Sequence, residues 1–279
     1  MWTIFVFVPL FLMALVCYVL PQSWVVVMHR WMEVWLYLWT GFNRVLIRVL
    51  RISELDVRWP GGDTVSPDLW YLVICNHQTW TDILVLQTVL WGRVPQVKFF
   101  TKQELIWIPA IGLGMFALGF PYVKRATKEQ IKKRPELRNA DRDSIAEACE
   151  RFQEHPCTVL NFLEGTRFTA AKHSRQNARF ERLLNPKIGG VSYVLDNMED
   201  HLHRLLDITI AYPDGTPTFW EFLEGRCPRV VVHIDTVEVP ALERDEADDS
   251  GKAVRRQMAA WLEQRWQHKD ALLAQLRSQ

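Results

Sequence analysis

Apolar residues dominate the amino-terminal part of the chain before any regular alternation begins. No charged side chain occurs from Met1 to Met28, which is longer than the roughly 20 apolar residues that span a bilayer core. Pro21 is expected to end or kink the first helix. Tryptophans then recur at helical spacing and arginines follow, as at a membrane boundary: Trp24, Trp31, Trp35, Trp39, and Arg30, Arg44, Arg48, Arg51.

Residues 1–53 are therefore predicted to form a membrane anchor and an amphipathic helix, with a transmembrane helix or a hairpin that re-enters one leaflet. The arginines predict that the rest of the chain lies on the cytoplasmic face, which is the inner membrane in a bacterium. A pair of buried core helices is the alternative interpretation of the same pattern.

Short apolar runs alternate with helical segments through the rest of the chain. Strands are predicted over residues 69–75, 97–101, 120–123, 158–163, 206–212 and 229–237. Helices are predicted over residues 83–90, 104–118 and 141–153, the last capped by Asp141 or Asp143. This alternation predicts an α/β fold, a mostly parallel sheet flanked by helices, in one domain over residues 54–244. Residues 245–279 are predicted to be an acidic linker and a closing helix.

Composition narrows the possible functions. The chain has 279 residues, 49% of them hydrophobic, and a net charge of +1. A neutral chain whose basic runs lack interleaved aromatic residues is not expected to bind nucleic acid. The five cysteines are scattered without CxxC spacing, which predicts free thiols and no metal site. The pattern leaves the oligomeric state open.

A histidine and an aspartate follow the first predicted strand of the domain. His77 and Asp82 are five residues apart, where the strand gives way to a helix. A neutral imidazole can remove the proton of an attacking hydroxyl, and a carboxylate can fix its tautomer and stabilise the imidazolium. Thr79 and Thr81 lack a G-x-S-x-G setting, so direct attack by a substrate hydroxyl is favoured over an acyl-enzyme. Helix capping is the alternative role for Asp82.

A second polar motif, Glu164-Gly165-Thr166-Arg167, follows the strand predicted at residues 158–163. Glycine permits close approach of a ligand, and the planar guanidinium of Arg167 suits a phosphate. Glu164 is expected to hold that arginine or bind a glycerol hydroxyl, and Thr166 can donate one further hydrogen bond. A strand-end turn stabilised by a surface ion pair is the alternative.

Three blocks in this order resemble those of the glycerolipid acyltransferases, which include the 1-acylglycerol-3-phosphate acyltransferases. They are Asn76-His77-x4-Asp82, residues 119–125 and residues 162–167. Residues 102–105 resemble the K-x-E-L stretch of the family, and residues 207–213 its fourth block in the lysocardiolipin-acyltransferase-like branch. The resemblance covers about residues 70–235. Trp80 departs from the small residues frequent in the first block, which leaves the identity of the acceptor open.

The resemblance implies the roles of individual residues and the reaction. It implies that His77 is the base and Asp82 its partner. It also implies a set of residues that bind the acceptor and its phosphate: Lys102, Arg125, Glu164, Gly165, Thr166 and Arg167. The implied reaction moves a fatty acyl chain from acyl-CoA or acyl carrier protein to a lysophospholipid, above all 1-acyl-glycerol-3-phosphate. No cofactor is implied beyond that donor, and membrane phospholipids are the expected surroundings. A lysophospholipase or thioesterase, and a non-catalytic lipid-binding protein, are the alternatives.

Overall fold

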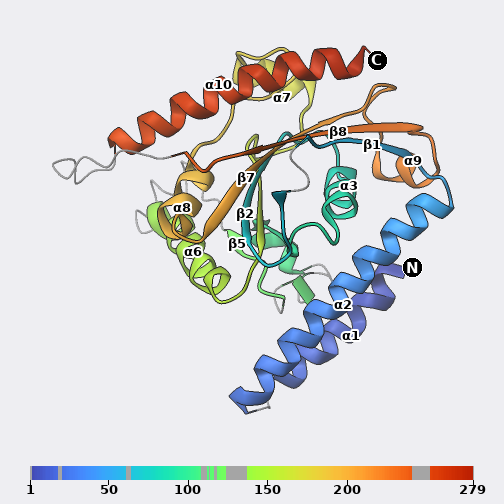
Figure 1. Cartoon of the computed structure of the whole chain (residues 1–279), viewed down its shortest axis with the longest axis vertical. Helices are drawn as coiled ribbons and strands as arrows, with labels where there is room; N and C mark the ends of the chain where they lie inside the picture. The colour runs from blue at the N-terminus through green and yellow to red at the C-terminus, as the bar shows by residue number, and fades with distance from the viewer. Residues whose placement is uncertain are drawn as a thin grey trace.

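The structure of the chain is a computed structural model. It describes residues 2–17, 21–60, 64–107, 112, 114–115, 118–123, 137–240 and 252–278. A six-stranded sheet forms the centre, in the order β1-β8-β7-β2-β6-β3 (Figure 1). These strands are β1 (Glu54–Arg58), β2 (Trp70–Cys75), β3 (Val97–Phe99), β6 (Thr158–Phe162), β7 (Leu202–Ala211) and β8 (Arg229–Val237). Every neighbouring pair is parallel except β7 and β8, which confirms the predicted α/β fold.

Two hydrophobic cores lie on opposite faces of the sheet. Leu72 and Ile74 of β2 belong to one core, and Tyr71, Val73 and Cys75 belong to the other. This alternation explains why β2 is a continuous apolar run, since a strand covered on both faces buries every side chain. The first core is closed by α6 (Leu137–Gln153), α8 (Gly189–Met198) and α10 (Lys252–Arg277), and the second by α3 (Thr81–Leu90) and α9 (Phe219–Leu223). Each fully buried aliphatic side chain contributes about 1.5–3 kcal/mol.

Several predicted elements differ from those observed. The strand expected over residues 97–101 is divided: β3 pairs with β6, whereas β4 (Thr101–Lys102) pairs with β5 (Tyr122–Val123) in a separate two-stranded sheet. The expected helix over residues 104–118 begins as a 3₁₀ turn, η2 (Gln103–Trp107), and part of the remainder lies outside the described residues. Helix α6 begins at Leu137, so Asp141 and Asp143 lie within it and are not its caps. The acidic linker over residues 245–250 is outside the described residues.

The amino-terminal segment forms two helices, α1 (Trp2–Cys17) and α2 (Gln22–Val49). Figure 1 shows them side by side as a hairpin that extends from the sheet domain. Leu10 of α1 and Met32 of α2 share a cluster with Phe120. Among the helices of the described residues, none has both the length and the apolar character needed to cross a membrane. The prediction of a transmembrane helix is therefore not supported: Pro21 caps α2 and divides the apolar stretch, and charged residues interrupt α2.

Candidate active site

The candidate site lies where β2 and β6 end beside each other. These strands are parallel and Cys75 is aligned with Phe162, so the loops that follow them leave the same edge of the sheet. The His77 Nδ1 atom lies 2.8 Å from Asp82 Oδ2 across the β2–α3 connection. Asp82, in the first turn of α3, is fully buried, whereas 12% of the His77 side chain is exposed. The predicted histidine–aspartate pair is thus formed, with the imidazole at the rim.

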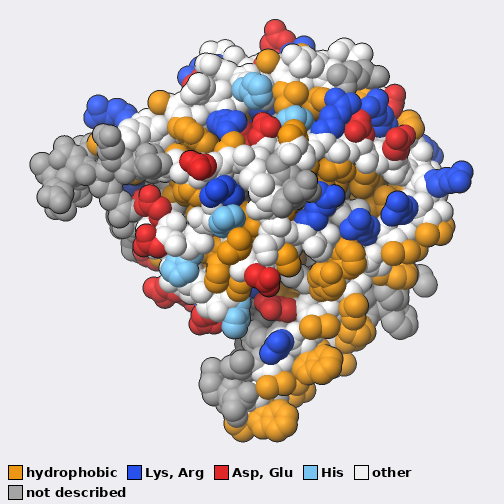
Figure 2. All heavy atoms as spheres, viewed as in Figure 1, with side chains coloured by type: hydrophobic (Ala, Val, Ile, Leu, Met, Phe, Trp, Pro, Cys, Tyr) orange, Lys and Arg blue, Asp and Glu red, His pale blue; other side chains and the backbone are white. Residues whose placement is uncertain are grey.

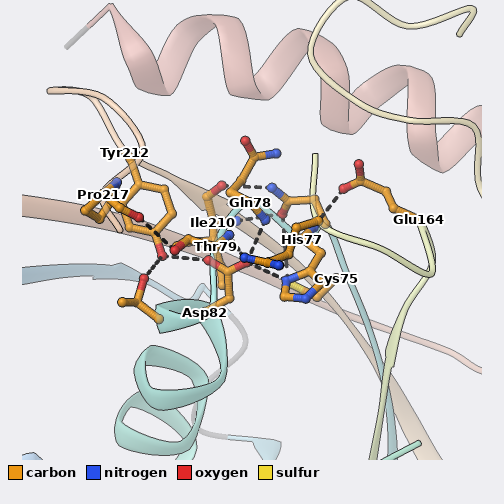
Figure 3. A network of polar contacts seen from close by, with 12 residues as sticks. Cys75, His77, Gln78, Thr79, Asp82, Glu164, Ile210, Tyr212 and Pro217 are labelled. Carbon is orange, nitrogen blue, oxygen red and sulfur yellow. Dashed lines mark hydrogen bonds and ion pairs between the residues drawn. The ribbon is translucent and has the colours of Figure 1, made fainter. Parts of the chain in front are cut away.

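Four donors surround the Asp82 carboxylate. Its Oδ2 atom faces His77 and accepts hydrogen bonds from the main-chain N–H groups of Gln78 at 2.6 Å and Thr79 at 3.0 Å. Its Oδ1 atom accepts from the Tyr212 hydroxyl at 2.6 Å (Figure 3). Asp82 therefore closes the turn before α3 and also orients the histidine. Because an ionised carboxylate only accepts hydrogen bonds, Nδ1 of His77 carries the hydrogen and Nε2 is left as the basic nitrogen.

Tyr212 was not assigned a role from the sequence. Burial, together with the adjacent Asp82, raises the pKa of Tyr212 well above its usual value. The phenol therefore stays protonated and serves Asp82 as a permanent donor. A tyrosine that ends a buried strand needs a partner for its hydroxyl, which is the signal in the sequence that could have identified it.

The loop that carries His77 is fixed at several points. The Asn76 side chain bonds both the N–H and the C=O of Ile210 in β7, each at 2.9 Å. The Thr79 hydroxyl donates to the Pro217 carbonyl at 2.7 Å. The imidazole of His77 stacks on Phe162, with ring centroids 4.0 Å apart and an angle of 17° between the planes. These contacts hold the histidine in one orientation before a substrate binds.

Glu164 does not have the position expected from the sequence. Its side chain is fully buried and accepts from the main-chain N–H groups of His77 at 2.7 Å and Leu184 at 3.0 Å. Burial raises the pKa of Glu164 to about 8, although the two N–H donors oppose this rise. The Glu164 carboxyl group thus joins the two motifs through the main chain of His77 (Figure 3), and its hydrogen bonds within the described residues do not include Arg167.

The rest of the second motif is partly buried. Gly165 has φ +63°, and a Cβ atom there would lie 2.9 Å from the Lys187 side chain, so conformation and space both favour glycine. Lys172 Nζ donates to the Thr166 hydroxyl and to the Arg167 carbonyl, each at 2.8 Å. The Thr166 hydroxyl accepts in this bond and keeps its own hydrogen for donation. The guanidinium carbon of Arg167 lies 4.7 Å from the centre of the Trp80 ring system.

Two further predicted binding residues are not placed beside the histidine by the described part of the structure. Lys102 ends β4, and its side chain is not described. Arg125 lies outside the described residues. Their roles in binding the acceptor remain predictions.

The segment that contains the site matches a known family of enzymes. The family model "Acyltransferase" matches residues 57–212, more than half of the chain, and this segment includes both polar motifs. The chain belongs to the acyltransferase family. The resemblance identified from the sequence motifs is thereby confirmed.

Curated relatives include two named lipid acyltransferases. The chain is 25% identical over 224 residues to 1-acyl-sn-glycerol-3-phosphate acyltransferase epsilon of Mus musculus, covering 72% of this chain and 56% of that protein. It is 25% identical over 228 residues to lysocardiolipin acyltransferase 1 of Danio rerio, covering 76% and 54%. The chain thus spans little more than half the length of these relatives.

A solved structure shares the fold. The crystal structure of the 1-acyl-sn-glycerophosphate acyltransferase from Thermotoga maritima matches with a TM-score of 0.50 at 16% identity, covering 96% of each chain. At this identity, the likeness concerns the arrangement of helices and strands.

Proposed function

We propose that this protein transfers a fatty acyl chain from a thioester, acyl-CoA or acyl carrier protein, to the free hydroxyl of a lysophospholipid. The acceptor proposed is 1-acyl-glycerol-3-phosphate. The observation that carries the proposal is the 2.8 Å contact of His77 Nδ1 with Asp82, which leaves Nε2 as a base at the rim of the site. Arg167, on the adjacent loop, supplies a positive charge for the acceptor phosphate.

The reaction follows from this arrangement. The acceptor hydroxyl attacks the thioester carbonyl carbon while Nε2 of His77 takes its proton. A tetrahedral intermediate forms with a new C–O bond, and Asp82 stabilises the imidazolium beside it. The C–S bond then breaks, and the departing thiolate receives the proton held on Nε2. No metal or bound cofactor takes part in these steps.

The thiol of Cys75 and the hydroxyl groups of Thr79 and Thr81 do not suit an acyl-enzyme. Cys75 is fully buried, and burial raises the pKa of its thiol well above the usual value, which suppresses the nucleophilic thiolate. The Thr79 hydroxyl donates to Pro217, and the Thr81 hydroxyl is bonded to Tyr212 at 3.1 Å. Both threonines are also buried. Direct transfer to the acceptor, with His77 as the base, is the route that this environment favours.

The α1–α2 hairpin supports activity at a membrane surface. Figure 2 shows apolar side chains gathered over this hairpin. On α2, Trp24 is 60%, Trp31 61% and Leu38 57% exposed. Exposed tryptophans beside aliphatic residues suit the interface of a bilayer, where both the lysophospholipid and the diacyl product reside. We propose that the hairpin rests on the membrane and that the catalytic domain lies on its cytoplasmic side.

Product analysis tests the proposed function. Purified wild-type protein and His77→Ala would receive radiolabelled acyl-CoA or acyl carrier protein, with lysophosphatidate, lysophosphatidylglycerol or lysocardiolipin, in liposomes. A labelled diacyl lipid from the wild type alone is the expected result, and it would identify the acceptor. Labelled free fatty acid as the sole product would indicate a hydrolase. Lipid binding without turnover from any donor would indicate a non-catalytic lipid-binding protein.

A further inference from the structure

Trp80 occupies an unusual place beside the candidate base. It is the residue directly before α3, between His77 and Asp82 in the chain, and 47% of it is exposed. The guanidinium carbon of Arg167 lies 4.7 Å from the centre of its ring system. Trp80 follows β2 and Arg167 follows β6, so this contact joins the two motifs across the edge of the sheet. An indole at this exposed position thus supports the one arginine of the second motif.

An aromatic face and a carboxylate hold a guanidinium in different ways. A carboxylate binds the N–H edge of the fork and neutralises its charge, whereas an indole attracts the cation through its face. The N–H groups then remain available in the guanidinium plane, and the positive charge is retained. An indole can therefore orient an arginine for a ligand without replacing that ligand.

Arginines in the domain differ in their partners, and Arg93 lies over Trp59 at 5.3 Å much as Arg167 lies over Trp80. Arg179, Arg182 and Arg229 each form an ion pair with a carboxylate, at 2.7, 2.6 and 2.5 Å. Within the described residues, Arg167 forms no such pair, and its side chain contacts the face of Trp80. Among the described residues, Arg167 is thus oriented by an aromatic face and its N–H groups stay available for an external anion.

We infer that Trp80 is a positioning residue that sets Arg167 for the phosphate of the acceptor and so favours acceptors that carry a phosphate over uncharged ones. The inference rests on the proposed function, because it concerns the acceptor of that reaction. A cation–π contact between partly exposed groups is expected to contribute about 0.7–1.4 kcal/mol, which corresponds to a factor of about 3 to 10. Loss of the indole is therefore expected to weaken acceptor binding by about 3- to 10-fold.

Steady-state kinetics with short-chain, monomeric acceptors test this role without a membrane. In Trp80→Ala, KM for lysophosphatidate should rise about 3- to 10-fold with kcat little changed, while KM for monoacylglycerol, which has no phosphate, should stay as in the wild type. Trp80→Phe, which keeps an aromatic face, should lie between these values. Trp220→Ala is the matched control, because Trp220 is 70% exposed and its ring contact is with Phe219; its kinetics should match the wild type.

A double-mutant cycle shows whether Trp80 acts through Arg167. In an Arg167→Ala background, Trp80→Ala should have no further effect on KM for lysophosphatidate. Additive effects of the two substitutions would overturn the inference, as would an equal loss on both acceptors or a fall in kcat alone.

The inference can fail separately from the proposed function. If the wild type forms no diacyl lipid, the proposed function fails, and equilibrium binding of radiolabelled lysophosphatidate in detergent becomes the test. Equal weakening by Trp80→Ala and Arg167→Ala would support the positioning role. Wild-type affinity in Trp80→Ala would overturn it.

Discussion

Replacing Asp82 by asparagine separates the charge of this residue from its hydrogen bonds. The amide oxygen of asparagine can take the place of Oδ2 and accept from His77 Nδ1–H and from the N–H groups of Gln78 and Thr79. The amide NH2 group of the asparagine then faces Tyr212. The Tyr212 hydroxyl can accept a hydrogen bond from this group and donate its own hydrogen to Thr81. The geometry of the loop is therefore expected to survive, and the main loss is the negative charge.

The expected effect on catalysis is far larger than the effect on stability. An imidazolium and a carboxylate with charge centres about 4 Å apart attract each other by about 4 kcal/mol at an effective dielectric constant of 20. Losing this stabilisation of protonated His77 lowers kcat by about 10³-fold, and as much as about 10⁴-fold if the amide also selects the other tautomer. The free energy of unfolding should change by no more than about 2 kcal/mol. The amide makes weaker hydrogen bonds than the carboxylate, but burying it avoids the desolvation cost of a buried charge.

The assay is acyl transfer under saturating substrates, with thermal unfolding of the same samples. Tyr212→Phe is the matched variant: it removes the hydroxyl that donates to Asp82 at 2.6 Å and leaves the charge in place. It should destabilise the fold by about 1–3 kcal/mol and lower kcat by no more than about tenfold. A folded Asp82→Asn enzyme that keeps more than a tenth of wild-type turnover would refute the electrostatic role of Asp82.

Three other predictions address different parts of the molecule. Because the pKa of Glu164 is raised to about 8 from an ordinary 4.5, the folded protein binds this proton more tightly than the unfolded chain does. The free energy of unfolding should therefore fall as pH rises from about 4.5 to 8. Glu164→Gln should flatten this pH dependence, measured by urea titrations at pH 5 and pH 8. An unchanged slope in the variant would show that Glu164 is not the source of the pH dependence. Gly165→Ala should lower stability by about 1–2 kcal/mol in thermal unfolding, because φ is +63° and the new methyl group would meet Lys187 at 2.9 Å; unaltered stability would contradict this reading of the turn. Combined replacement of Trp31 and Leu38 by serine should reduce co-sedimentation with phospholipid vesicles while preserving activity on short-chain acceptors. If the variant sediments as the wild type does, this face of α2 is not the membrane contact.

The sheet could be predicted from the sequence where strands are covered on both faces. Strands β2, β6 and β8 are rich in apolar and β-branched residues, and their predicted positions agree with the structure within one residue. Strand β1 was missed because Glu54–Arg58 is a short edge strand with only two apolar residues, whose identity depends on pairing with β8. Helix α8 was also missed, since it begins with two glycines and has no side-chain cap.

The candidate site could be predicted only where its contacts are local in the sequence. His77 and Asp82 are close in sequence, so local geometry sufficed to predict that they meet. Tyr212 reaches Asp82 from 130 residues away, and this contact exists only once β7 lies beside β2. The inward orientation of Glu164 likewise depends on the main chain of Leu184, which no local pattern reveals.

Intact-mass spectrometry combined with product analysis would show whether the acyl chain passes directly to the acceptor with His77 as the base. Wild-type enzyme and His77→Ala would be mixed with stoichiometric acyl donor, first without and then with lysophosphatidate. Direct transfer should leave the protein mass unmodified throughout and give diacyl product only when the wild type receives the acceptor. A covalent acyl adduct on the wild type that is transferred to the acceptor, or diacyl product from folded His77→Ala, would contradict it.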